Sequence, residues 1–438
     1  MKSIDKIPTS KIQRASKMVS TGAKIGVNYL KYYGEKLVGS EEKAKAKLDE
    51  NNATDIYDSL KSMKGSALKM AQMMSMDKTM LPQAYVEKFS LSQFSVPPLS
   101  APLVRKTFKR YFGKDTEELF DKFNYEAINA ASIGQVHQAE KDGKKLAVKI
   151  QYPGVADSIG SDLAMVKPIA LRMLNIKGKD ADRYFQEVEE KLMEETDYAL
   201  ELQQSKAVSD VCRHIPNLLF PYYYEELSND KILTMDWMEG IQISTFAKEN
   251  TSPERANKVG QALWDFYMYQ IHVVRKVHAD PHPGNFMVSK DDELIAIDFG
   301  CMKEIPEDFY FPYFELTKPE ILNDPIAFEK QLYALEILKD TDTKEETVFF
   351  SKIFKELLGL FALPFYEKEF DFSNPAFFDQ IANMAAKYSK DDSLRKADAG
   401  RGSTHFIYIN RAFFGLYSLM NELQSDKIVV NNYLSIDN

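Results

Sequence analysis

"HADPHPGNF" at residues 278–286, followed by "AIDFG" at residues 296–300, is the most informative pattern in the sequence. Asp280 and Asn285 are five positions apart, and Asp298 follows Asn285 after thirteen positions, beyond a predicted short hairpin. Phosphoryl transfer from ATP uses carboxylate and amide oxygens to hold Mg²⁺, and a carboxylate to orient the acceptor. The pattern D-x-x-x-x-N followed by D-F-G therefore predicts that Asp280 orients or deprotonates the acceptor. It also predicts that Asn285 and Asp298 bind the metal.

Two segments upstream fit the same chemistry. "LAVKI" supplies Lys149 in a V-A-I-K-like setting, which predicts a strand lysine that reaches the phosphates. "NAASIGQV" at 129–136 matches the frame G-x-G-x-x-G-x-V, with alanine at position 131 where glycine would allow the closest backbone approach. We expect a stiffer hairpin over the nucleotide, formed by Asn129, Ala131, Ser132, Gly134 and Val136.

The lysine needs an acidic partner on a helix, and the helical stretch "KLMEETDYALELQQ" at 191–204 offers several acids. Glu195, Asp197 and Glu201 fall within two turns, so spacing alone leaves the choice among them open. Farther on, "MDWMEG" at 235–240 reads as a connector between two lobes. We expect its backbone at Met235, Asp236 and Met238 to hydrogen-bond adenine.

The order of predicted elements indicates an α+β, bilobal protein-kinase-like fold with a small antiparallel sheet and a helical large lobe. Apolar residues three and four apart predict a helical extension at 1–102, which ends in the Pro-rich "SVPPLSAP". A small lobe with a long helical insert follows at 103–238, and the helical large lobe carries the catalytic and metal-binding loops at 239–438.

Composition excludes several classes of protein. The 438 residues are 44% hydrophobic and 28% charged, as in ordinary globular proteins, and no apolar stretch is long enough to span a bilayer. Two cysteines, Cys212 and Cys301, cannot form a disulfide scaffold or a thiolate zinc site. His278 and His282 flank Asp280, but we expect loop architecture there and no zinc. We see no signal peptide and expect a cytoplasmic protein, or one bound peripherally to a membrane.

Charge is distributed unevenly along the chain. The net charge is −9, yet residues 1–38 carry eight basic and two acidic side chains, which leaves −15 on the rest. An acidic body argues against nucleic acid as a partner. The spaced lysines of the basic head are most simply the solvated face of a helix that packs against the body. The alternative is that the head, with apolar residues among its lysines, contacts an anionic membrane or another partner. The oligomeric state is not indicated.

Taken in order, "KMAQ", "AASIGQVH", "AVKIQYPGV", "EETDYALE", "MDWMEG", "HADPHPGN" and "IDFG" resemble the UbiB/AarF family of atypical protein-kinase-like proteins. The resemblance covers about residues 55–305. It implies a kinase-like fold that binds ATP, or ADP, with Mg²⁺, and a link to isoprenoid quinone or membrane-lipid metabolism. It further implies that Lys149 pairs with Glu201 and that Lys69 and Gln72 lie over the nucleotide pocket. Glu195 and Asp197 would hold the extension in place.

The chain departs from ordinary protein kinases after the D-F-G motif. No A-P-E motif follows, and Ala279 replaces the arginine of H-R-D. The family's K-x-G-Q motif also has Ala71 in place of glycine. We therefore expect an ATPase or a kinase that acts on a small molecule or lipid and does not phosphorylate proteins. The alternative is a nucleotide-binding regulatory or scaffold protein whose turnover is incidental.

Overall fold

The computed structural model describes residues 11–38, 40–76, 83–90, 98–131, 133–174, 179–249, 252–389 and 401–433. The chain divides into two compact units. The first contains Met1–Gln203 and Tyr222–Trp237, and the second contains Gln204–Pro221 and Met238–Asn438. The three-part division at 102 and 238 stays a prediction.

The first unit contains a five-stranded antiparallel sheet. Its strands are β1 (Lys122–Phe123), β2 (Asn129–Ala130), β3 (Gly134–Lys141), β4 (Lys144–Gln151) and β6 (Ile232–Asp236). A turn at Asp142 and Gly143, both with positive φ, joins β3 to β4. The apolar side chains of one face, such as Val148 and Ile150, are buried against helix α5 (Ala101–Phe112) and the chain around Phe120.

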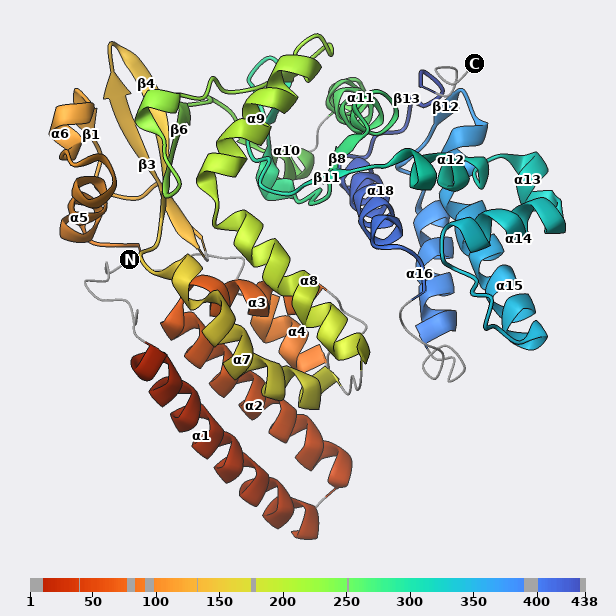
Figure 1. Cartoon of the computed structure of the whole chain (residues 1–438), viewed down its shortest axis with the longest axis horizontal. Helices are drawn as coiled ribbons and strands as arrows, with labels where there is room; N and C mark the ends of the chain where they lie inside the picture. The colour runs from red at the N-terminus through yellow and green to blue at the C-terminus, as the bar shows by residue number, and fades with distance from the viewer. Residues whose placement is uncertain are drawn as a thin grey trace. The chain divides into compact units, whose positions relative to one another are not determined.

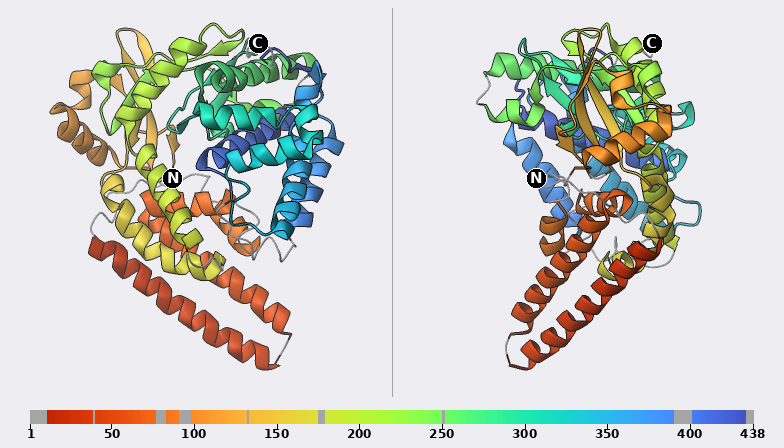
Figure 2. Two further views of the ribbon diagram at one scale, coloured as in Figure 1. Left: turned by 45° about the vertical axis from the view of Figure 1, so that its right-hand side comes forward. Right: turned by 90° about the vertical axis from the view of Figure 1, so that its left-hand side faces the viewer.

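A layer of helices lies beside this sheet (Figure 1). Its helices come from the N-terminal extension and from the segment that follows β4. Helices α1 and α2 form an antiparallel hairpin that projects beyond the others (Figure 2). Met63, Leu68 and Phe89 from the extension share one apolar core with Ile159 and Leu192, so the extension packs on the helices after β4. The layer consists of α1 (Lys11–Val38), α2 (Glu41–Met63), α3 (Gly65–Met76), α4 (Gln83–Ser90), α7 (Val155–Leu174) and α8 (Lys179–Glu195). The short α6 (Thr116–Leu119) precedes β1, and α9 (Tyr198–Cys212) runs from the first unit into the second.

The second unit is mainly helical around one large apolar core rich in aromatic side chains. Its helices are α10 (Ile243–Lys248), α11 (Pro253–Tyr269), α12 (Glu307–Glu315), α13 (Pro319–Asn323), α14 (Pro325–Ala334), α15 (Lys344–Phe361), α16 (Pro375–Ser389) and α18 (Thr404–Glu422). Its strands are β5 (Leu218–Leu219), β7 (Ile241–Gln242), β8 (Lys276–His278), β9 (Phe286–Val288), β10 (Leu294–Ala296), β11 (Met302–Glu304), β12 (Glu369–Phe370) and β13 (Ile428–Val429).

Two small sheets flank the loops that contain Asp280, Asn285 and Asp298. The first has the order β5-β10-β9-β7, with β5 and β10 parallel, and the second pairs β8 with β11 in antiparallel fashion. These elements confirm the predicted α+β class. None of the described helices combines the length and the apolar character needed to cross a membrane.

Candidate functional site

Lys149 on β4 forms a two-oxygen ion pair with Glu201 on α9. The ammonium nitrogen lies 2.7 Å from Oε1 and 2.9 Å from Oε2, and the Glu201 side chain is only 3% exposed. Lys149 lies in the middle of the sheet, because its neighbours in register are Val136 on β3 and Leu233 on β6. A lysine held in this way presents a fixed positive charge from a rigid strand.

Tyr198 on α9 contacts the same lysine and the glycine-rich frame. The Lys149 ammonium lies 4.9 Å from the centre of the Tyr198 ring. A side-chain carbon at Gly134 would lie 2.6 Å from the Tyr198 hydroxyl and 2.7 Å from the carbonyl oxygen of Ile150. Glycine at position 134 is therefore required for close packing. Residue spacing gives no indication of this role for Tyr198, because its contacts cross from a helix to two strands.

Gln135 and His137 form a buried hydrogen-bond chain on the opposite face of β3 from Gly134 and Val136. Leu99 N donates to Gln135 Oε1 at 2.7 Å, Gln135 Nε2 lies 2.6 Å from His137 Nε2, and His137 Nδ1 lies 2.8 Å from the carbonyl oxygen of Asn124. A carbonyl can only accept, so Nδ1 carries the proton and Nε2 accepts from Gln135. These hydrogen bonds fix the face of β3 that points away from Gly134 and Val136. The sequence signal that could have revealed them is a pair of polar residues, Gln135 and His137, at alternate positions of a predicted strand.

Burial lowers the pKa of His137 from 6.5 to about 4. Because the folded protein binds this proton more weakly, the stability contributed by neutral His137 is complete above pH 6.5 and is lost as pH falls towards 4. We expect the free energy of unfolding to fall by up to about 1.4 kcal/mol per pH unit more in the wild type than in His137→Gln. Urea unfolding between pH 7 and 4 measures this difference, with the exposed His214→Gln as assay control. Equal slopes would contradict the assignment.

Lys69 on α3 pairs with Glu195 at the end of α8, with 2.8 Å between Nζ and Oε2 and both side chains about 15% exposed or less. Asp197 does something different: its carboxylate caps α9 by accepting from Leu200 N at 3.0 Å. Gln72 lies in α3, and its side chain is outside the described residues, as is all of Ser132. The extension helix α3 is thus tied to α8 by a charge pair.

The connector residues are engaged in the first unit's own structure. Asp236 N donates to the Tyr222 carbonyl oxygen at 2.8 Å, and the Asp236 carboxylate accepts from Tyr224 Oη at 2.8 Å and from Tyr222 N at 3.1 Å. Met235 pairs with Ala147 in the β4–β6 ladder. The polar groups of Asp236 therefore fasten β6 to the chain at 222–224.

In the second unit, the strand register brings Asp280, Asn285 and Asp298 to one end of the β9–β10 hairpin. Ala296 faces Phe286, and beyond that pair Ile297 N donates to the carbonyl oxygen of Asn285 at 3.1 Å. Asn285 Nδ2 donates to the carbonyl oxygen of Asp280 at 2.9 Å, while Asp298 Oδ1 accepts from Gly300 N at 3.0 Å.

These residues fit a magnesium ion. Nδ2 of Asn285 is turned towards the Asp280 carbonyl group, so Oδ1 is the Asn285 atom that would bind a metal, and Asp298 would supply a carboxylate. Across the described ranges no three His, Cys, Asp or Glu side chains gather as a metal cluster. His282 Nδ1 accepts from Gly284 N at 3.0 Å, so this histidine shapes the loop as the sequence analysis expected.

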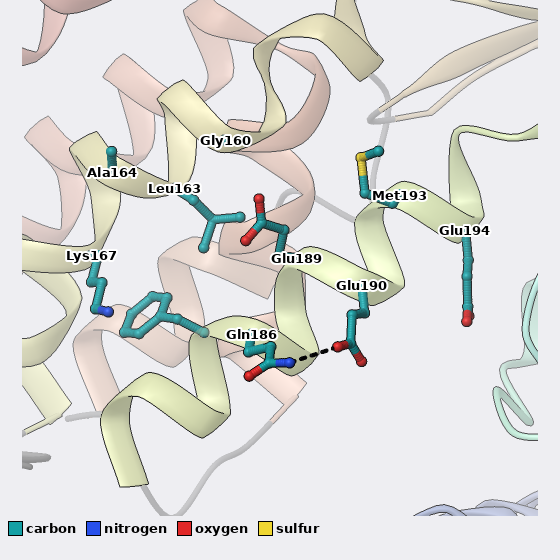
Figure 3. Close-up of a pocket in the computed structure, with 10 residues that line it drawn as sticks. Gly160, Leu163, Ala164, Lys167, Gln186, Glu189, Glu190, Met193 and Glu194 are labelled. Carbon is teal, nitrogen blue, oxygen red and sulfur yellow. Dashed lines mark hydrogen bonds between the residues drawn. The ribbon is translucent and has the colours of Figure 1, made fainter. Parts of the chain in front are cut away.

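A pocket of about 940 Å³ lies in the first unit between α7 and α8 (Figure 3). Leu163 and the buried Phe185 form its apolar part, and Glu189, Glu190 and Lys167 lie at its polar edge. None of the ten residues that line it belongs to the set predicted from the sequence, although Glu194 is adjacent to Glu195.

Comparison with known proteins gives consistent results. Residues 91–330 match the family model described as "ABC1 atypical kinase-like domain". The chain is 29% identical over 86% of its length to the mitochondrial atypical kinase COQ8 of Saccharomyces cerevisiae. It is 29% identical over 67% of its length to the chloroplastic protein ACTIVITY OF BC1 COMPLEX KINASE 8 of Arabidopsis thaliana. With mouse AarF domain-containing protein kinase 1 the values are 28% and 71%.

The chain spans 75% of the yeast protein, 61% of the mouse protein and 40% of the Arabidopsis protein. A solved structure titled as the complex of Rv3197 with erythromycin from Mycobacterium tuberculosis has a TM-score of 0.62 and 23% identity. It covers 91% of this chain and 98% of its own. At this identity the likeness shows a shared fold.

Proposed function

We propose an ATP-dependent activity for this chain, which belongs to the ABC1 atypical kinase-like family. The protein binds ATP with Mg²⁺ and either hydrolyses ATP or transfers its terminal phosphoryl group to a small molecule or lipid. The resemblance to the UbiB/AarF family is confirmed by the relatives named above. The quinone or membrane-lipid link that this resemblance implies is part of the proposal.

The observation that carries the proposal is the ion pair between Lys149 and Glu201. Kinases need this pair to orient the phosphates, and a lysine without its acidic partner would lose that orientation. In the proposed reaction Lys149 binds the phosphates, Asp298 and Asn285 hold Mg²⁺, and Asp280 orients the acceptor. Bound Mg²⁺ would neutralise the charge that develops on the phosphoryl oxygens. Because Asp236 N is already bonded, we assign the adenine contact to the backbone of Met238.

A small acceptor is supported by the chain after the D-F-G motif. β11 ends at Glu304 and α12 begins at Glu307, so a helix directly follows the short strand. Ala279, where H-R-D kinases have arginine, is 1% exposed and cannot pair with a phosphorylated side chain. These features favour water, a small molecule or a lipid headgroup as the acceptor.

The test measures binding and turnover separately. We expect ATP with Mg²⁺ to raise the melting temperature of the full chain more than ATP with EDTA, and we expect the release of ADP over time. Assays with and without anionic vesicles cover a lipid-dependent activity. Nucleotide binding without any turnover, in both conditions, would favour the regulatory or scaffold alternative. Absence of binding would refute both.

We also propose that α1 contacts an anionic membrane. On this helix Val19 and Leu30 are each 74% exposed and lie on one face, because eleven residues make about three turns. Lys17 and Lys24 are also exposed, roughly 120–160° around the helix axis from that face. Arg14 is buried and does not contribute to that surface. We expect Leu30→Glu to reduce sedimentation of the protein with phosphatidylserine vesicles at low salt. Unchanged sedimentation would remove the proposal.

The cytoplasmic assignment stays a sequence prediction, and two relatives carry organelle names.

A further inference from the structure

Helix α18 lies outside residues 91–330, the segment that matches the family, yet it packs on the strands that lead into and out of the catalytic motifs. β8 precedes Asp280 and β11 follows Asp298, and the two strands pair with Met302 opposite His278. α18 contacts both strands, and Figure 1 shows it beside them. Helix α18 therefore supports the antiparallel pair of β8 and β11.

One face of α18 contacts both β11 and the loop that follows β8. Tyr408 and Gly415 are seven residues apart, which places them on the same side of a helix after two turns. The Lys303 ammonium, on β11, lies 5.1 Å from the centre of the Tyr408 ring. Gly415 faces Pro281, the residue directly after Asp280.

Gly415 is packed so closely that no side chain fits. A carbon atom built on it would lie 2.1 Å from Pro281 Cγ, 2.9 Å from Pro281 Cβ and 3.3 Å from the Pro281 carbonyl oxygen. Ordinary contact begins near 3.4 Å. The same peptide segment is anchored from the other side, because the Asp280 carbonyl oxygen accepts hydrogen bonds from His282 N and Asn285 Nδ2.

We propose that Gly415 is a positioning residue: by lacking a side chain it lets α18 support Pro281 and so fixes the orientation of Asp280. This inference rests on the proposed function for its effect on turnover, but its structural part does not. Proline transmits the contact directly, because its ring fixes φ and leaves the peptide after Asp280 little freedom.

Alanine at position 415 would have to displace the loop, because α18 itself is held firmly. The Phe413 ring stacks on Tyr313, with centres 6.4 Å apart and planes 4° apart, and Tyr417 Oη donates to the Phe361 carbonyl oxygen at 3.0 Å. A shift of roughly 1 Å at a group that orients the acceptor lowers kcat by on the order of 100-fold. The KM for nucleotide should change little, since Lys149 and Glu201 are unaltered.

The experiment compares Gly415→Ala with Gly359→Ala in the full chain. Gly359 lies inside α15 with nothing within 4 Å of a built side-chain carbon, so it controls for adding alanine to a helix. We expect faster hydrogen exchange at residues 276–286 in Gly415→Ala only, and a kcat loss only there. Pro281→Ala, which removes the atom at 2.1 Å, should restore part of both in the Gly415→Ala background.

Two results would overturn the inference. One is wild-type exchange at residues 276–286 in Gly415→Ala. The other is faster exchange in α18 with an unchanged loop, which would mean that the helix and not the loop had yielded. If the wild type turns over no nucleotide, the proposed function fails, and the exchange comparison still decides the role of Gly415.

Discussion

Replacing Asp298 by asparagine is expected to reduce Mg²⁺-dependent ATP turnover by on the order of 10³-fold while the protein stays folded. The substitution keeps size and shape, and an amide oxygen can still accept the hydrogen bond from Gly300 N that Asp298 Oδ1 accepts at 3.0 Å. It removes the negative charge that the proposed metal site needs beside the neutral amide of Asn285. The loss therefore falls on the metal and not on the fold.

The measurement is ATP turnover together with the melting temperature in ATP, with either Mg²⁺ or EDTA. In Asp298→Asn we expect the extra stabilisation by Mg²⁺ to disappear and the stabilisation in EDTA to remain. Asp292→Asn is the matched control in the same hairpin. Asp292 pairs with Arg255 at 2.7 Å and has φ of 57°, which asparagine tolerates. A full Mg²⁺ response in Asp298→Asn would refute the assignment of this carboxylate as a ligand.

Removal of Arg14 is expected to have the largest effect on stability, because it would leave a buried carboxylate without its counter-charge. The Arg14 and Asp162 side chains are 3% and 0% exposed, and the guanidinium binds both carboxylate oxygens, with 2.6 Å from Nε to Oδ1. Ser66 and Ser158 also donate to Asp162. Breaking such a pair by deleting one partner costs about 3–5 kcal/mol. We expect that loss in the first unit for Arg14→Met.

The same guanidinium holds the joint between α2 and α3. Arg14 Nη1 donates to the Met63 carbonyl oxygen at 2.8 Å, and Nη2 donates to that of Lys64 at 3.3 Å. At this joint Gly65 has φ of 58° and packs so closely on Val155 that an added carbon would lie 2.9 Å away. Since α3 carries Lys69, we expect Arg14→Met to loosen the helix that pairs with Glu195 as well.

Urea unfolding monitored by circular dichroism measures the loss. The double variant Arg14→Met, Asp162→Asn should recover most of it, because a neutral amide is far easier to bury without a partner than a carboxylate. Lys36→Met is the control: its pair with Glu41 is exposed, and such pairs contribute about 1 kcal/mol or less. If Arg14→Met cost no more than Lys36→Met, the buried pair would not stabilise the helical layer.

The proximity of the metal and catalytic candidates could be predicted from the sequence because their geometry is local, and their roles stay predictions. Asp280, Asn285 and Asp298 lie within one loop and one hairpin, and hairpin register follows from short-range pairing. Lys149 was recognisable for the same reason, since it lies in an alternating strand next to a turn. The α+β class followed from the switch between helical and strand periodicity.

Residue spacing could not identify the contacts that join distant segments, although the family resemblance implied the pair of Lys149 and Glu201, which the structure shows. Spacing left Glu195, Asp197 and Glu201 as equal partners for Lys149, and three-dimensional packing gave them separate tasks. Glu201 pairs with Lys149, Glu195 pairs with Lys69, and Asp197 caps α9.

Arg14, counted in the sequence as part of a basic head, is buried against Asp162, which lies 148 positions away. Gly415 and Pro281 are likewise remote in the chain, and their contact exists only because α18 packs on β8 and β11. Residue type and short spacing determine which chemistry a loop can perform. Burial and long-range packing determine which charges meet, because desolvation makes each buried charge depend on a partner that the local sequence does not contain.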